Sequence, residues 1–366
     1  MFLTARIFGI FTYIVCLVIA LLGVRYLPPR QTKYVVWGYL VVLCLIALCY
    51  IPYITTDVYR HNQLAAALAQ MPLDNFLYIL STAKSGLFTF IYFRIFEGYL
   101  MPVTCAIVFG SMFFILLTSA KQIQCTRSII FLVLLWIMTN DFYLISITNI
   151  RSYVAVAFVT FCMYRETFEH KFNLFNVILY LCAIEMHSMG IVLVAFRTLA
   201  YLFSGGKLSV WKMLLVPLII MLLIVGLPFY QDLLIGSTNK FESYYTGNSY
   251  NYIWERVIFI IQTIVQVFIL YKAYAYRLFK EHNFANYKTA VTWAVIVLLI
   301  CHLHVTFMQR WIMVSAILEI PLLMCLLKKE QELHRHQIKQ FLIVSCLITF
   351  AFVCTRGNLC SLKFWE

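Results

Sequence analysis

The sequence carries little charge. Only 12% of its 366 residues are Asp, Glu, Lys or Arg, about half the usual share in a globular domain. In contrast, 63% of the residues are apolar and the mean hydropathy is +0.88. A soluble domain of this size cannot hide that much apolar surface in one core. The composition therefore excludes a soluble enzyme, a disordered chain and, despite a net charge of +13, a nucleic-acid-binding domain.

Several common motifs are also missing. Most of the 12 cysteines lie inside apolar runs, without a C-x-x-C pair or zinc-ligand spacing, so they act as small hydrophobic residues. His302 and His304 form an H-x-H pair without an evident third ligand, so neither a metal nor another cofactor is expected. No G-x-G-x-x-G segment indicates a nucleotide-binding domain.

Long apolar runs fill the chain instead. A membrane-crossing helix needs about 20 mostly apolar residues, and shorter runs can extend into polar residues that face the protein interior. We expect about 12 transmembrane helices in a single transmembrane domain over residues 1–366. The predicted spans are 7–24, 34–53, 99–118, 128–139, 150–164, 172–184, 189–203, 213–229, 253–271, 289–304, 311–327 and 341–354.

The basic residues set the direction of these spans. With the N-terminus outside, six inner loops hold seventeen of the 28 lysines and arginines, and the outer segments hold ten. This asymmetry is typical of cytoplasmic loops. The two larger outer-face loops are 54–98 and 230–252. Within the first, the apolar stretch Leu87–Phe96 is too short to span, so it either lies in the interface or re-enters the membrane.

Ionisable residues gather on the predicted outer face. Asp57 and Arg60 are either a helix start with a solvated charge or part of a site. Arg151, with Asn149 before it as a predicted N-cap, either binds an anion or extends to lipid headgroups. Arg310 beside Trp311 has the same alternatives. His187, between two apolar runs, is either a satisfied loop histidine or part of a site. Arg197, inside a span, is expected to pair or to extend to the interface, and Glu319 before Pro321 to be a buried hydrogen-bonded carboxyl.

The order of these segments resembles a known family. TTDVYRHN is followed by NIRSYVAVAF, by AIEMHSMGIVLVAF, by NKFESYYTG and by MQRWIMVSAILEIP. Together they are similar to the EpsG-type family of Wzy polysaccharide polymerases, over about residues 50 to 325. The most specific parts are N-x-R-x-x-x-A from Asn149 and A-x-x-x-H-S-x-G from Ala183. The chain departs at Ser152, where the family usually has glutamine.

The resemblance implies an all-α, GT-C-like polytopic membrane enzyme. It would transfer a growing glycan from undecaprenyl diphosphate to a lipid-linked repeat unit, at the outer face of the bacterial cytoplasmic (inner) membrane. It would be a metal- and nucleotide-independent glycosyltransferase making O-antigen, capsule or exopolysaccharide. Its partners would be lipid-linked oligosaccharide donor and acceptor, membrane lipid and a chain-length regulator protein, without nucleic acid.

Site roles follow from that chemistry. Arginine binds phosphate oxygens with a planar fork, so Arg151 and Arg310 are the leading diphosphate ligands and Arg60 and Lys240 the secondary ones. His187 is the first candidate for the base, followed by Asp57 and Glu185. The remaining substrate-binding candidates, from the same segments, are Asn149, Tyr59 and Tyr244.

Other functions remain open at this stage. A flippase for the same lipid-linked sugar is one alternative, although the chain shows no internal repeat and its ionisable residues lie near one face. An O-antigen ligase and a membrane acyltransferase are the others. Accumulation of a single repeat unit on deletion would separate a polymerase from a flippase or a ligase.

Overall fold

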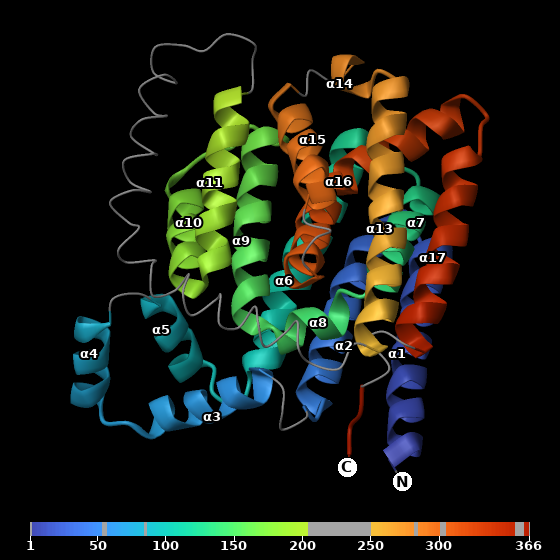
Figure 1. The fold of residues 1–366 in the computed structure, drawn as a ribbon. Coiled ribbons are helices and arrows are strands. Elements are labelled where there is room, and N and C mark those ends of the chain that lie inside the picture. The colour runs from blue at the N-terminus through green and yellow to red at the C-terminus, as the bar shows by residue number, and fades with distance from the viewer. Residues whose placement is uncertain are drawn as a thin grey trace.

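A computed structural model describes residues 2–52, 57–83, 86–203, 250–281, 285–300, 305–355 and 362–365. Within these ranges the chain is helical and contains no β-strand (Figure 1). The long helices are α1 (Phe2–Tyr26), α2 (Thr32–Cys49), α6 (Leu100–Ile123), α9 (Ile150–Thr167), α13 (Tyr250–Ala275), α16 (Val305–Glu332) and α17 (Gln337–Thr355). The shorter ones are η1 (Pro29–Gln31), α3 (Asp57–Gln70), α4 (Leu73–Thr82), α5 (Leu87–Ile95), α7 (Arg127–Thr139), α8 (Tyr143–Thr148), α10 (Leu174–Met186), α11 (Ser188–Phe203), α14 (Leu278–Glu281) and α15 (Ala285–Ile300).

Six of these helices are long and apolar enough to cross a membrane, namely α1, α2 with η1, α6, α13, α16 and α17. Four shorter apolar helices, α7, α10, α11 and α15, run beside them. Many large apolar side chains on α1 and α2 face outward, such as Ile19 at 63% and Val41 at 60% exposed. A helix that is apolar all round is expected where lipid replaces water. The described part of the chain is therefore that of a helical membrane protein.

The core surrounds α16. Almost the whole apolar part of this helix is buried, and it packs against α6, α7, α9, α13, α15 and α17. α6 links this centre to α2. The interior position of α16 explains how it accommodates polar residues such as Ser315, whose hydroxyl donates to Gln266 of α13. Buried polar groups in a lipid environment must find partners inside the protein.

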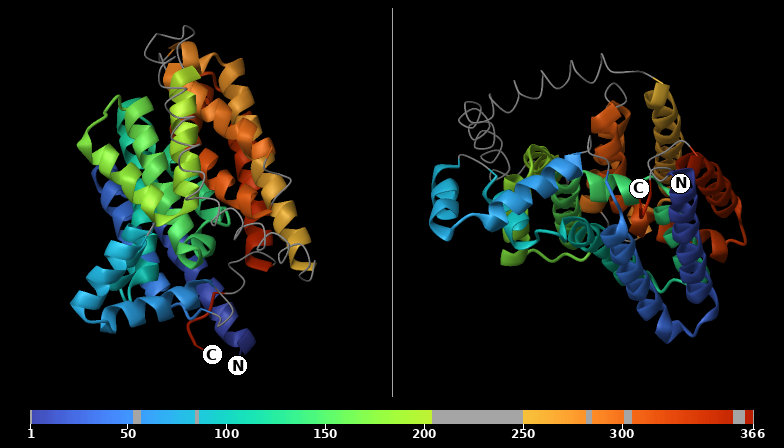
Figure 2. Two further views of the ribbon diagram at one scale, coloured as in Figure 1. Left: turned by 60° about the vertical axis from the view of Figure 1, so that its left-hand side comes forward. Right: turned by 90° about the horizontal axis from the view of Figure 1, so that it is seen from below.

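One end of the bundle carries helices that run across it. α3 and α4 extend sideways from this end, and α5 returns toward α10 (Figures 1 and 2). The first residues of α9, α11 and α16 reach the same end, as do both chain termini (Figure 1). We call it the outer end, following the predicted topology, and we call the opposite end the inner end. The Leu87–Phe96 stretch is the short helix α5, packed on α3.

Span 213–229 and residues 230–249 of the second loop lie outside the described residues, whereas residues 250–252 begin α13. The other predicted spans coincide in position with helices, six of which are long and apolar enough to cross a membrane. Some helices differ from the predicted spans in length. α9 continues past the predicted end at residue 164 to Thr167, and α16 runs from Val305 to Glu332. The segment 54–98, predicted as a loop, contains α3, α4 and α5.

Candidate functional site

Four separate parts of the chain bring the predicted site residues together at the outer end. They are the start of α3, the first turn of α9, the turn between α10 and α11, and the first turns of α16 (Figure 1). Asp57 is the first residue of α3, Arg151 is the second of α9, and Arg310 is the sixth of α16. Each charged residue therefore stands at a helix end rather than in the apolar middle, where charge is costly.

Arg151 is the electrostatic centre of this group. Its guanidinium is half-buried and has two charged neighbours. Asp57 stabilises the charge of Arg151, whereas Arg310 repels it. Arg60 shares Asp57, because its guanidinium forms an ion pair with that carboxylate. Among the described residues, Asp57 is the carboxylate that acts on Arg151. The guanidinium groups of Arg60, Arg151 and Arg310 at this end suit an anionic ligand.

His187 joins this group through Ser152, the neighbour of Arg151. The His187 Nε2 atom lies 3.4 Å from the Ser152 hydroxyl oxygen. The other ring nitrogen, Nδ1, accepts a hydrogen bond from the backbone N–H of Met189 at 3.0 Å. A neutral imidazole has one donor and one acceptor nitrogen. Since Nδ1 is the acceptor, the neutral ring carries its proton on Nε2, facing Ser152.

Close packing between the backbone at the start of α11 and the backbone of α10 holds His187 in place. His187 is extended between α10 and α11, and its carbonyl accepts from the Gly190 N–H at 2.7 Å. A Cβ atom added to Gly190 would lie 2.0 Å from the Ala183 carbonyl oxygen. Only glycine fits there, which gives a physical reason for the A-x-x-x-H-S-x-G spacing.

We expect Gly190→Ala to lower the free energy of unfolding more than a substitution at an exposed position does. The added methyl group would push α11 away from α10 and displace His187, at a cost of about 1–3 kcal/mol. Thermal unfolding in detergent, compared with Gly38→Ala, would measure the effect. Gly38 is the matched control because an added Cβ there meets no atom within 4 Å. Equal unfolding temperatures for the two variants would contradict the prediction.

Glu185, the third candidate base, has a structural role. Its Oε2 atom accepts hydrogen bonds from the backbone N–H groups of Gly86 at 3.0 Å and Leu87 at 3.1 Å. These are N–H groups at the start of α5, which a carboxylate stabilises. Gly86 has a φ of +82°, a backbone conformation that favours glycine. The Glu185 carboxylate therefore fastens α5 to the end of α10.

Asn149 occupies the predicted N-cap position of α9, but its side chain does not cap the helix. Its amide nitrogen donates to the Ile145 carbonyl at 3.2 Å and to the Thr148 hydroxyl at 3.4 Å. Both acceptors belong to the preceding short helix α8. An irregular loop before α9 would not place these acceptors beside Asn149. Asn149 therefore joins α8 to α9.

The remaining candidates are placed only in part. Tyr59 is half-buried on α3, beside the exposed Arg60. Lys240, Tyr244, His302 and His304 lie outside the described residues. Glu319 is buried in α16 as expected, but neither carboxylate oxygen has a hydrogen-bond partner among the described residues. The prediction that this carboxyl is hydrogen-bonded is wrong for that part of the chain.

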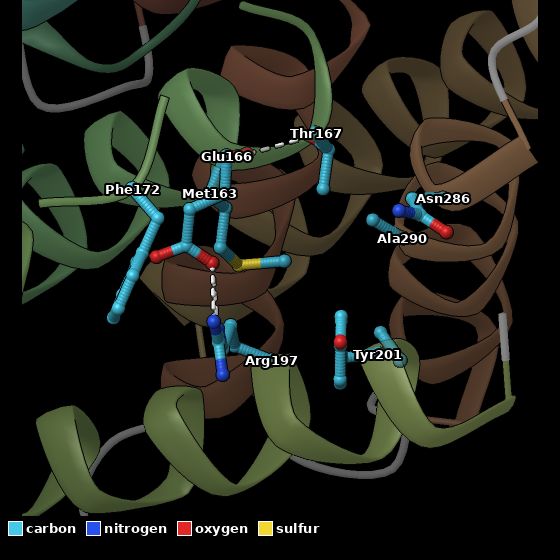
Figure 3. A pocket seen from close by; sticks show the side chains of 9 residues that line it. Met163, Glu166, Thr167, Phe172, Arg197, Tyr201, Asn286 and Ala290 are labelled. Carbon is cyan, nitrogen blue, oxygen red and sulfur yellow. Dashed lines mark hydrogen bonds and ion pairs between the residues drawn. The ribbon is translucent and has the colours of Figure 1, made fainter. Parts of the chain in front are cut away.

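A second polar group, at the inner end, was not predicted as a site. The prediction that Arg197 is paired is confirmed, and the partner is Glu166, 31 residues earlier. Beside this pair lies a cavity of about 390 Å³ between α9, α11 and α15 (Figure 3). The sequence signal was weak, because Glu166 follows the predicted end of its span and nothing in the spacing relates it to Arg197.

Comparisons with known proteins found no matching family model, no matching curated protein and no matching solved structure. The fold of the described residues defines the class of the protein, a helical membrane protein. Its function therefore rests on the chemistry of the two polar groups.

Proposed function

We propose that the protein is a bacterial polysaccharide polymerase. In this proposal it transfers a growing glycan from undecaprenyl diphosphate to a lipid-linked repeat unit at the outer face of the cytoplasmic membrane. The observation that carries the proposal is the approach of Arg151 and Arg310 from different helices, with Asp57 as the nearby carboxylate. Two half-buried cations that repel each other are stabilised by a ligand with at least two negative charges, and a diphosphate is such a ligand.

The chemistry follows from this charge distribution. Breaking the bond between the sugar C1 and the phosphate oxygen leaves the electron pair on the diphosphate, where the two guanidinium groups stabilise it. The acceptor hydroxyl forms the new bond to C1 and loses a proton. Asp57 is the carboxylate of this group that can accept the proton, since Glu185 is engaged by two backbone N–H groups. Its ion pair with Arg60 has to loosen for that step.

For His187 we propose a role other than that of a base. With Nδ1 bound to the Met189 N–H, the ring presents an N–H at Nε2. We assign His187 as a hydrogen-bond donor, directly or through Ser152, to an oxygen of the lipid diphosphate. A base role would require the proton to move to Nδ1, which would break the hydrogen bond from Met189.

A flippase for the same lipid-linked sugar is the second candidate. The observation that favours it is Glu319, a buried carboxyl in the middle of α16 without a hydrogen-bond partner in the described part of the chain. Carboxyl groups within a membrane often mark ion pathways in transporters. The charged residues of the outer end favour the polymerase, because they do not lie near the midplane where transporter sites occur.

The test is a deletion strain complemented with the wild-type gene. The surface glycan is separated on a gel and the lipid-linked intermediates are extracted. A polymerase predicts single repeat units on the surface of the deletion strain and a ladder after complementation. Loss of all surface glycan, with lipid-linked units trapped inside the cell, would instead establish the flippase.

A further inference from the structure

The cavity at the inner end is lined on one side by an ion pair. Arg197 Nη2 lies 2.6 Å and Nε 2.7 Å from the same oxygen, Oε2, of Glu166. In Figure 3 these two side chains meet on one side of the cavity, and Tyr201 and Asn286 lie across from them. Phe172, Tyr180 and Tyr201 place their ring centres 5.5–5.7 Å from the guanidinium carbon. Cation–π contacts of this kind hold the guanidinium in a fixed orientation.

The carboxylate of this ion pair is fully engaged. The second oxygen of Glu166, Oε1, accepts from the Tyr180 hydroxyl at 2.8 Å and from the Asn176 amide at 3.5 Å. The Glu166 side chain is only 10% exposed, whereas that of Arg197 is 24% exposed. A ligand in the cavity therefore meets the guanidinium more readily than the carboxylate.

A second buried carboxylate, also paired with more exposed cations, lies next to the cavity-lining segment in the sequence. The Glu169 side chain is 3% exposed, and it is paired with Arg165 at 4.0 Å and with Lys171 at 3.7 Å. The Lys171 side chain is 62% exposed. Among the described residues of this region, the two carboxylates, Glu166 and Glu169, are less exposed than the cations paired with them, Arg165, Lys171 and Arg197. The accessible surface is thus positive and suits an anion.

The rim of the cavity has the composition of a membrane interface. Tyr201 and Phe172 are 48% and 60% exposed, and on the two helices that line the cavity with α9, the exposed rings of Phe203 in α11 and Trp293 in α15 stack at 5.7 Å. Exposed aromatic residues are typical of the boundary between hydrocarbon and headgroups. The basic loops also predict that this end faces the cytoplasm, where anionic lipids attract cations.

From these observations we infer that the cavity binds the phosphate headgroup of an anionic phospholipid. Arg197 is the ligand for the phosphate, Lys171 adds positive charge, and the aromatic rim contacts the glycerol and the first methylene groups. A cavity of about 390 Å³ has the size of a small-molecule site. This site does not depend on the polymerase activity, because it lies at the opposite end of α9 from Arg151 (Figure 1).

The experiment uses the full chain reconstituted in nanodiscs of phosphatidylcholine with a minor fraction of phosphatidylglycerol. Native mass spectrometry then counts the lipids that remain bound after release into detergent. The wild type is expected to retain phosphatidylglycerol in preference to phosphatidylcholine. Equal retention of the two lipids would overturn the inference.

Two variants and one control identify the site. The double variant Glu166→Gln and Arg197→Gln keeps the net charge and leaves no orphaned carboxylate, and we expect it to bind phosphatidylglycerol about tenfold more weakly. Ala200→Leu keeps every charge but fills the cavity, and we expect the same loss. Lys288→Gln removes an exposed cation of α15 that lies over the Tyr274 ring, outside the cavity, and should bind as the wild type does.

Each other outcome has a defined meaning. If Lys288→Gln weakens binding as much as the double variant, the preference is general surface attraction and the site is refuted. If inorganic phosphate at a low concentration displaces the lipid, the cavity takes a soluble phosphate and the lipid assignment is wrong. If the double variant misfolds, Ala200→Leu becomes the test of the site. Unchanged lipid binding in that variant refutes the cavity as the lipid-binding site.

Discussion

Replacing Arg151 or Arg310 with alanine is expected to abolish glycan polymerisation while the protein still inserts into the membrane. Removing one preorganised group that stabilises developing charge typically lowers a rate by about a hundredfold to a thousandfold. Polymer should therefore be absent from surface-glycan gels of either variant, with single repeat units in its place. Arg151→Lys should retain part of the activity, because an ammonium keeps the charge but loses the bidentate geometry.

The matched control is Arg256→Ala. Arg256 is an exposed arginine near the start of α13, at the same end of the bundle as Arg151. The Arg256→Ala substitution removes the same net charge from the outer end. Arg256 itself lies outside the group formed by Asp57, Arg151 and Arg310. A normal ladder is expected from this variant. If Arg256→Ala loses the ladder as well, or if Arg310→Ala keeps it, the two arginines do not hold the diphosphate as proposed.

The helices of this protein are largely predictable from its sequence, because apolar runs of sufficient length have few alternatives in a membrane. Their ends are not. α9 runs past its predicted end because Arg165 and Glu166 have partners inside the bundle, Asn176 and Arg197. α16 extends to Glu332, and its Glu330 accepts from the backbone N–H of Ile338 at the start of α17. Such partners lie on other helices, so hydropathy alone does not reveal them.

The gathering of the candidate site residues at one end of the bundle was predictable from the sequence, but their contacts were not. The spacing of helix ends was enough to bring Asp57, Arg151, Arg310 and His187 to one end of the bundle. The function of each side chain depends on contacts that no local pattern contains. Glu185 binds the start of α5 and Asn149 binds α8, so neither is available in the manner that the motif suggested. The inner cavity was missed because its ion pair joins residues 31 apart in the sequence.

His187 separates two mechanisms that the sequence could not distinguish. As a base, it must accept a proton at Nε2, and every uncharged replacement should inactivate the enzyme. As a donor, it must present an N–H at Nε2, and the side-chain amide of glutamine can place an N–H near the same position. The hydrogen bond from the Met189 N–H to Nδ1 favours the donor.

We therefore expect His187→Ala to lose activity by about a hundredfold and His187→Gln to stay within about tenfold of the wild type. Polymer yield in the complemented deletion strain measures both, with protein levels in the membrane as the control. Inactivity of the glutamine variant, when it is present at normal levels, would contradict the donor role and return His187 to the base.

Nitrogen-15 spectroscopy of histidine-labelled protein gives a second, independent readout. The chain contains eight histidines, and the pair of ring signals missing from His187→Gln belongs to His187. Protonation at Nε2 in the neutral ring would agree with the donor, whereas protonation at Nδ1 would show that the Met189 hydrogen bond does not fix the tautomer. If the ring is protonated at Nε2 and the glutamine variant is active, the acceptor proton goes to another group. Asp57 is then the carboxylate whose replacement by asparagine should stop the reaction while leaving the lipid diphosphate bound.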